Sequence, residues 1–158
     1  MIDFSNYIQN YGKEVGLPNL KLNENGVCSL NFDGKINVDI VYNKDNDQCF
    51  FASPIGTVPV DGREEFYKQL LLSNAFGIEN GGAVLGIEEE EDRVVLSYTF
   101  IASTFSFELF KTVLGNFVTM VENWMGKYET LCRVSASSGS SGQDEAAVMP
   151  QAFAYARI

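Results

Sequence analysis

The chain of 158 residues contains no histidine, and this absence removes several kinds of chemistry at once. Histidine is the commonest general base and the commonest metal ligand in proteins. Hydrolases built around a catalytic histidine are therefore excluded, as are most zinc enzymes. The three cysteines, Cys28, Cys49 and Cys132, form no CxxC pair, and no glycine-rich phosphate-binding motif is present in the sequence. We predict that the protein catalyses no reaction and needs no metal or other cofactor.

The sequence also lacks a long hydrophobic run and a secretory signal. No apolar stretch approaches the roughly 20 residues of a membrane-spanning helix, and the first residues, Met-Ile-Asp-Phe-Ser, have no basic start followed by an apolar run. We therefore expect a cytoplasmic protein without membrane insertion. Hydrophobic residues still make up 46% of the chain, including 12 Phe and 7 Tyr. That content excludes disorder throughout and suits one sizeable core.

Positive charge is scarce, since 11 Lys and Arg face 21 Asp and Glu, for a formal net charge of −10. Basic and acidic residues cancel beyond Cys132, so residues 1–132 carry the whole excess. Such a surface repels phosphate backbones, which argues against nucleic acid as a partner. Two interpretations stay open: the charge keeps the protein soluble, or it attracts basic polypeptides.

Hydrophobic periodicity predicts an α+β fold, an antiparallel sheet with three helices in the order α-β-β-β-α-β-β-α. The segment Leu20–Leu22 is at most a further short strand. Asp61 and Glu64 have the spacing of a helix capping box, and Gly77 should end the same helix. The expected helices cover about 3–15, 61–76 and 105–131, and the expected strands about 28–32, 36–42, 49–55, 83–87 and 94–101.

The third helix carries the most regular pattern. From Phe107 to Leu131 its apolar residues recur at alternating steps of three and four, the spacing of a coiled-coil seam. Further apolar residues widen this stripe, so we predict a core helix across the sheet, with a free coiled coil as the alternative. The composition then changes to Ser, Gly and Ala. We predict a domain over 1–132 and a flexible C-terminal tail over 133–158.

Both faces of the expected sheet carry apolar residues. Phe50 and Phe51 must point to opposite faces, because successive side chains of a strand alternate. If Tyr42 faces the long helix, then Val41 faces away from it. Surplus apolar surface on an acidic soluble protein indicates association with another polypeptide. Alternatively, the first helix and a homodimer contact cover all of this surface.

Four sequence segments within about residues 3–131 resemble, in the same order, segments of the class I chaperones of bacterial type III secretion, the Tir-chaperone-like family. They are Val15-Gly-Leu-Pro18, Leu30-Asn-Phe-Asp-Gly-Lys-Ile36, Phe66-Tyr-Lys-Gln-Leu-Leu-Leu72 with Asn74-Ala-Phe76, and Gly82-Ala-Val-Leu-Gly86 before an acidic turn. The resemblance implies a cytoplasmic bacterial homodimer that catalyses no reaction. Such a protein binds an N-terminal segment of a secreted effector in extended form and delivers it to the secretion apparatus. The extension beyond Cys132 departs from the shared pattern.

The resemblance also implies sites. In the family the dimer forms through the second helix and the strand after it, which indicates Phe66, Leu70, Val84 and Leu85 as interface residues or, alternatively, as core. For effector binding we predict the less covered sheet face and the first helix, contributed by Tyr7, Tyr11, Leu20, Leu22, Val41 and Phe50. Two other functions stay open: a chaperone-like regulatory protein without a secretion role, and a small-molecule or lipid carrier with a pocket between sheet and third helix.

Overall fold

The computed structural model describes residues 4–77 and 80–138. Its elements confirm the predicted α+β class and element order, and Leu20–Leu22 forms no strand. In chain order they are α1 (Phe4–Glu14), β1 (Val27–Phe32), β2 (Ile36–Asn43), β3 (Gln48–Thr57), α2 (Arg63–Asn74), the 3-10 turn η1 (Ala75–Gly77), β4 (Val84–Glu88), β5 (Arg93–Ile101), the 3-10 turn η2 (Ala102–Thr104) and α3 (Phe107–Ser138).

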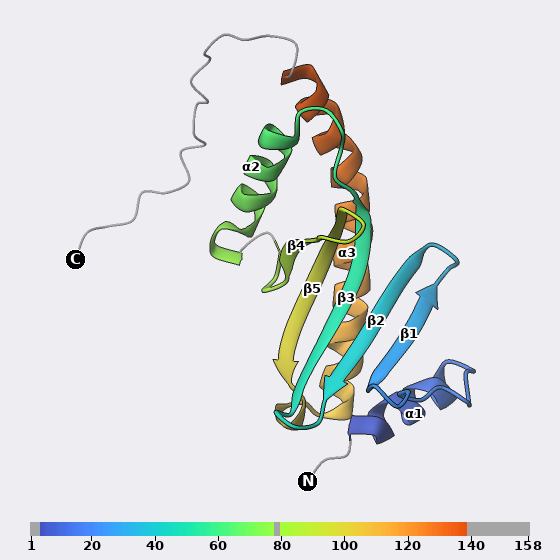
Figure 1. The fold of residues 1–158 in the computed structure, drawn as a ribbon. Helices are drawn as coiled ribbons and strands as arrows, with labels where there is room; N and C mark the ends of the chain where they lie inside the picture. The colour runs from blue at the N-terminus through green and yellow to red at the C-terminus, as the bar shows by residue number, and fades with distance from the viewer. Residues whose placement is uncertain (1–3, 78–79, 139–158) are drawn as a thin grey trace, which may run out of the picture.

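The five strands form one antiparallel sheet in the order β1-β2-β3-β5-β4 (Figure 1). The turn between β1 and β2 has positive φ at both Asp33 and Gly34, 53° and 70°, and the Lys35 N–H donates to the Phe32 carbonyl at 3.0 Å. Phe32 pairs with Ile36, so three residues separate the paired ends of the two strands. The chain leaves the sheet after β3 to form α2 and returns as β4 at the far edge. The sheet therefore has two edge strands, β1 and β4.

The helix α3 lies along one face of the sheet, which confirms the prediction of a core helix (Figure 1). Its buried side chains meet the buried side chains of the central strands. The Phe51 ring of β3 lies 6.0 Å from that of Phe110 and 5.6 Å from that of Phe117, centroid to centroid. The core positions of α3 are Phe110, Leu114, Phe117, Val121 and Trp124.

The helix α3 continues to Ser138, past the end that we predicted at Leu131. Ser135 is fully buried, and a Cβ added to Gly62 would lie 2.1 Å from the Ser135 carbonyl oxygen. The small residues that resemble a linker in composition thus allow the loop before α2 to pack directly on the helix. Residues 133–138 are helical, and the remainder of the predicted tail, 139–158, lies outside the described residues.

The start of α2 differs from the prediction. Gly62, with φ 68°, occupies the N-cap position, and no side chain caps the helix, so the capping box of Asp61 and Glu64 does not form. Arg63 forms an ion pair with Asp92 in the β4–β5 turn instead. The helix ends near the predicted stop, because η1 follows Asn74 and ends at Gly77 with φ 64°.

The first helix packs on the same side of the sheet as α3. The ring of Phe4 is buried, with its centroid 5.4 Å from that of Phe110, 5.1 Å from that of Tyr42 and 6.2 Å from that of Phe100. The possibility that α1 covers the second sheet face is therefore wrong.

Candidate binding surfaces

The sheet face opposite α3 carries none of the described helices (Figure 1). The strand register sets Val27, Val41 and Phe50 side by side across β1, β2 and β3 on this face. Phe50 is half-buried while Phe51 is fully buried on the other face, as the alternation predicted. This open face is therefore partly apolar without a helix to cover it.

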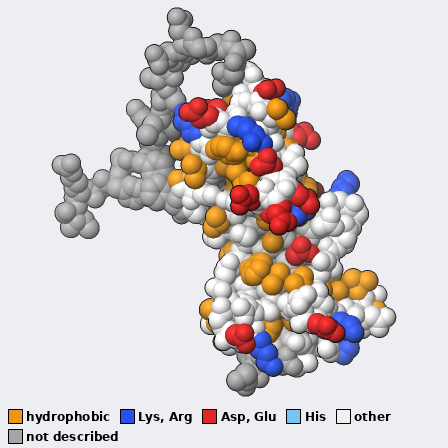
Figure 2. Space-filling view, viewed as in Figure 1, with side chains coloured by type: hydrophobic (Ala, Val, Ile, Leu, Met, Phe, Trp, Pro, Cys, Tyr) orange, Lys and Arg blue, Asp and Glu red, His pale blue; other side chains and the backbone are white. Residues whose placement is uncertain are grey.

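A hollow of about 760 Å³ lies at one end of the open face; we call it the sheet hollow. Its apolar lining comes from Leu22, Val41 and Phe50, and its rim includes Lys44 and Asp45. Figure 2 views the molecule from the open face and shows hydrophobic side chains gathered there in separate patches, with acidic side chains clustered near its middle. The hollow therefore combines an apolar floor with a polar, charged rim.

A tight turn before β1 builds one wall of the sheet hollow. The Asn23 side-chain oxygen accepts hydrogen bonds from the backbone N–H groups of Asn25 and Val27, each at 2.9 Å. Gly26 has φ 75°, and a Cβ there would lie 2.3 Å from the Tyr42 carbonyl oxygen. Only glycine allows this approach, which sets the turn directly against β2.

The structure brings together Leu22, Val41 and Phe50, half of the six residues predicted for effector binding. Leu20 packs on α1 instead, since a Cβ at Gly12 would lie 2.6 Å from the Leu20 Cβ. It lines a separate, smaller depression.

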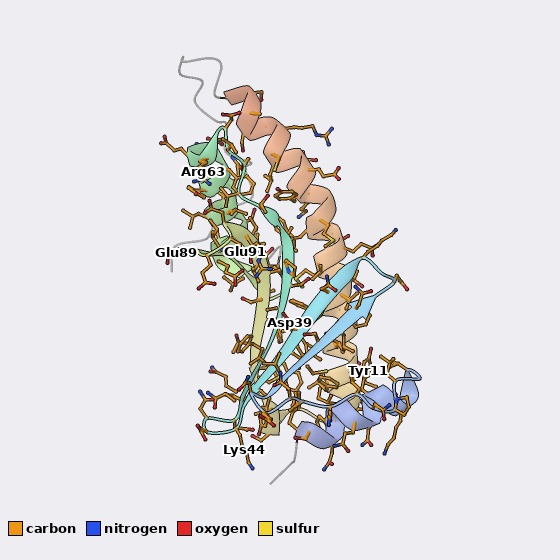
Figure 3. The ribbon with its side chains drawn as sticks, turned by 45° about the vertical axis from the view of Figure 1, so that its right-hand side comes forward. Tyr11, Asp39, Lys44, Arg63, Glu89 and Glu91 are labelled. Atoms are coloured by element: carbon orange, nitrogen blue, oxygen red, sulfur yellow. The ribbon has the colours of Figure 1, made fainter. Side chains whose placement is uncertain are left out.

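The two tyrosines predicted for effector binding turn toward α3, because α1 lies on that side. The Tyr7 hydroxyl donates to the Phe105 carbonyl at 3.0 Å, and the Tyr11 ring meets Phe110 edge to face at 6.0 Å. Burial, with a smaller contribution from Glu14, raises the pKa of Tyr11 (labelled in Figure 3). Both rings contribute to packing between α1 and α3, away from the sheet hollow.

A second apolar depression, the α2/β4 groove, lies between α2 and β4 and measures about 300 Å³. Leu71 is 72% exposed there and Ile87 is 41% exposed. The sequence analysis assigned neither residue to a binding surface, although both are apolar residues of predicted elements. The lining residues are Tyr67, Leu70, Leu71, Asn74, Leu85, Gly86 and Ile87.

The four predicted dimer residues occupy three different environments. Leu70 and Leu85 are nearly buried and line the floor of the α2/β4 groove. Phe66 is fully buried, with its ring centroid 6.2 Å from that of Tyr128 of α3. Val84 is 53% exposed and, one residue before Leu85 in the strand, points to the open face. The structure therefore brings two of the four together at one surface.

The outer edge of β4 is closed at Leu85 by a side chain. Asn74 Nδ2 donates to the Leu85 carbonyl at 2.8 Å, and the Leu85 N–H donates to Asn74 Oδ1 at 2.9 Å. Asn80 Nδ2 donates to the same oxygen at 3.2 Å, and Trp124 Nε1 donates to Asn80 Oδ1 at 3.0 Å. Because Asn74 satisfies both main-chain groups, a further strand cannot pair with β4 at Leu85.

Within the acidic run over 88–92, Glu88 ends β4 and residues 89–92 form the turn to β5. Arg93 pairs with Glu88 and Glu91, and Arg63 pairs with Asp92; Arg63, Glu89 and Glu91 are labelled in Figure 3. Hydrogen bonds to these carboxylates raise the pKa values of both arginines. Within the described residues, no group of three or more His, Cys, Asp or Glu is placed to hold a metal ion, and no helix is both long and apolar enough to cross a membrane.

The model of the Tir chaperone protein (CesT) family matches residues 6–125, which span both surfaces and nearly all of the sheet. The chain belongs to this family. Among curated proteins, this Tir chaperone family member is 28% identical over 119 residues to a Chlamydia pneumoniae protein named CPj0713/CpB0740, covering 75% of this chain and 90% of that protein. It is 25% identical over 114 residues to the transcriptional anti-antiactivator ExsC of Pseudomonas aeruginosa, covering 72% of this chain and 77% of that protein.

Solved structures share the fold of this Tir chaperone family member. The ExsC–ExsE complex matches with a TM-score of 0.69 at 23% identity, over 78% of this chain and 95% of the matched chain. The Yersinia pestis type III secretion chaperone SycH, solved with a stable fragment of YscM2, matches with a TM-score of 0.59 at 18% identity, over 77% and 99%. The predicted family and fold are thereby confirmed.

Proposed function

We propose that this Tir chaperone family member is a non-catalytic, dimeric chaperone that binds an N-terminal segment of a secreted effector and keeps it competent for type III secretion. The observation that carries the proposal is the sheet hollow, where Leu22, Val41 and Phe50 form an apolar floor that no helix covers, with Ser5 of α1 among the other lining residues. Fold relatives solved with protein partners, such as the HopA1–SchA chaperone–effector complex with its TM-score of 0.60, support this type of ligand.

An extended polypeptide suits the sheet hollow because several of its side chains can bind in the apolar lining. β1 is an edge strand, but Asn23 holds both main-chain groups of Val27 beside the hollow, so any backbone pairing of the ligand with β1 would have to begin beyond Val27. Each buried apolar anchor contributes about 1.5–3 kcal/mol, whereas ordering a disordered segment costs roughly 2–5 kcal/mol. The effector segment therefore needs several apolar anchors, which the three floor residues can receive.

The net charge of −10 favours an effector segment with a basic character. Opposite charge mainly accelerates association, and salt screens it. We therefore expect the association rate to fall with ionic strength while the dissociation rate changes little.

The dimer would form at the α2/β4 groove. Leu71 and Ile87 expose apolar surface there, and Leu70 and Leu85 supply a floor. Because Asn74 closes the β4 edge at Leu85, the two copies would meet through side chains rather than through a continuous sheet.

The test of effector binding uses Phe50→Ser and Val41→Asp in pull-downs with N-terminal segments of candidate effectors. Both variants should lose binding while keeping their helical content and their oligomeric mass. Val60→Asp is the matched control, because Val60 is 88% exposed and does not line the hollow. Normal binding by both hollow variants would refute the assignment of this surface.

A regulatory protein without a secretion role is the second candidate, favoured by the 25% identity to a transcriptional anti-antiactivator. The same surface would then bind a protein that is not exported. Identifying the co-purified partner by mass spectrometry and testing its export separates the two functions.

The carrier alternative has less support, because the space between sheet and α3 that it requires is filled by aromatic rings. Phe51, Phe110 and Phe117 pack there with centroids 5.6–6.0 Å apart.

A further inference from the structure

The α2/β4 groove combines uncovered apolar surface with a position next to the end of α3. Leu71 and Ile87 are exposed along it, and a soluble chain normally buries such a surface in a contact. The proposed function assigns the groove to a second copy of the chain. The inference below rests on that dimer surface and concerns what occupies it in the monomer.

We propose that the segment 148–158 of the same chain docks in the α2/β4 groove and competes there with the second copy. This segment would make self-association dependent on displacement of the chain's own C-terminal region.

The groove is within reach of this segment. α3 is described as far as Ser138, and the contact between Ser135 and Gly62 sets this part of the helix against the start of α2. Leu71 lies about 12 Å farther along α2 than Arg63, at 1.5 Å per helical residue. Fourteen residues, 139–152, separate Ser138 from Phe153. A flexible chain of fourteen residues has a root-mean-square span of about 20 Å, which exceeds the distance of about 12 Å along α2. Phe153 is therefore within reach of the groove.

The chemistry of the segment matches the groove. Its sequence, Val-Met-Pro-Gln-Ala-Phe-Ala-Tyr-Ala-Arg-Ile, sets Phe153 and Tyr155 at alternate positions between alanines. Arg157 is its sole charged side chain. The segment thus offers aromatic anchors for the apolar lining.

The groove favours side-chain docking over strand addition. Asn74 holds both main-chain groups of Leu85, so a sixth strand cannot begin there. The volume of about 300 Å³ is at the lower end for ligand pockets and suits an aromatic side chain. Tethering supplies the segment at an effective concentration of the order of 1 mM, well above micromolar concentrations of a second copy.

The effect of this competition on the dimer dissociation constant can be calculated. If docked and free forms stand at two to one, one third of the chains expose the groove. Because both copies must release their segments, the dimer dissociation constant rises about ninefold.

The first experiment measures that constant by sedimentation equilibrium on the full chain and on the double variant Phe153→Ser/Tyr155→Ser. The aromatic-free variant should dimerise about ninefold more tightly. The matched control Ala152→Ser/Ala154→Ser, which changes the intervening positions, should dimerise like the unmodified chain. Weaker dimerisation of the aromatic-free variant would overturn the proposal, because the segment would then bridge the two copies.

The second experiment measures docking in the monomer through the reaction of Leu71→Cys with a thiol reagent at nanomolar protein concentration. A Cys132→Ser background leaves only the buried Cys28 and Cys49 besides the new thiol. The intact segment should slow the reaction about threefold relative to the aromatic-free segment.

The outcomes separate this proposal from the proposed function. Equal reaction rates of the Leu71→Cys thiol with and without Phe153 and Tyr155 would overturn the docking. Protection of this thiol that rises with protein concentration and is the same for both segments would overturn it as well. Segment-dependent protection in a chain that never dimerises supports the docking and refutes the dimer.

Discussion

The two surfaces of this molecule, the sheet hollow and the α2/β4 groove, both lie beside a strand edge that an asparagine closes, and they differ in size and lining. At the hollow, Asn23 holds both main-chain groups of Val27 at the start of the edge strand β1, and at the groove Asn74 holds those of Leu85 in the edge strand β4. The hollow measures about 760 Å³ and has a polar, charged rim, whereas the groove measures about 300 Å³ and is mainly apolar. The hollow can therefore receive several side chains of an extended segment, while the groove suits a few apolar side chains.

The largest expected effect is on the free energy of unfolding, and it should appear at the floor of the groove but not at its rim. Leu70→Asp places an unpaired carboxylate among buried side chains and should lower the free energy of unfolding by at least about 3 kcal/mol. Leu71→Asp, one residue on but 72% exposed, should change it by less than about 0.5 kcal/mol and shift the oligomeric mass downward. Urea denaturation and light scattering provide the two measurements. Equal destabilisation would contradict the division into floor and rim.

The next effect tests how the hollow depends on backbone contact. Gly26→Ala introduces a Cβ 2.3 Å from the Tyr42 carbonyl oxygen at a φ of 75°, and should cost more than about 2 kcal/mol. Gly34→Ala is the matched control, because its φ is 70° but no atom lies within 4 Å of its Cβ, so only the conformational strain of about 1 kcal/mol applies. Thermal or urea unfolding compares them. Identical costs would mean that the turn moves freely relative to β2.

Removing the side chain that closes β4 should have a moderate effect. Asn74→Ala leaves the Leu85 main-chain groups without their partner and removes the Oδ1 acceptor to which Asn80 Nδ2 donates, at a cost of about 1–3 kcal/mol. The exposed edge should also promote strand pairing, seen as a concentration-dependent rise in β-sheet aggregates. Asn46→Ala in the exposed β2–β3 turn is the control. No change in either readout would show that the closure at Leu85 is unimportant.

The smallest effect concerns the turn between β2 and β3, next to the hollow. Hydrogen bonds from Ser103, and more weakly from Tyr42, lower the pKa of Asp47 below its ordinary value of 3.8. A lowered native pKa stabilises the fold above that value, and this contribution disappears as the pH falls through the native pKa. Asp47→Asn should therefore flatten the loss of stability below about pH 4. A variant curve parallel to the unmodified one would refute this role.

The fold could be predicted from the sequence because its signals are local. Alternation in the strands, the stripe of α3 and glycine stops determine the element order and the opposite orientations of Phe50 and Phe51. The position of α1 could not be predicted in this way, since its apolar stripe fits either sheet face and Phe4 selects one through contacts with distant rings. The helical residues 132–138 were missed because their composition resembles a linker, and the packing of Ser135 against Gly62 joins positions far apart in the sequence.

The binding surfaces were only partly accessible to sequence reasoning. Val41 and Phe50 follow from strand alternation, and Leu22 from its place before the Asn-Gly turn. The packing of Tyr7 and Tyr11 toward α3 could not be predicted, because helix periodicity gives a face but no neighbour. Leu71 and Ile87 emerge as a surface only when α2 and β4 lie side by side, an arrangement that depends on the hydrogen bonds of Asn74.

The hydrogen bond from Trp124 to Asn80 makes the protein its own optical probe. Trp124 is the single tryptophan of the chain, its indole is buried, and Asn80 links it to the Asn74 side chain at the groove. Indole emission responds to the polarity and hydrogen bonding around the ring. Unlabelled protein should therefore change its fluorescence when a ligand in the groove shifts Asn74, and keep it when a ligand fills the sheet hollow. A changed spectrum, without any added dye, would thus indicate that a partner has reached the groove and moved Asn74.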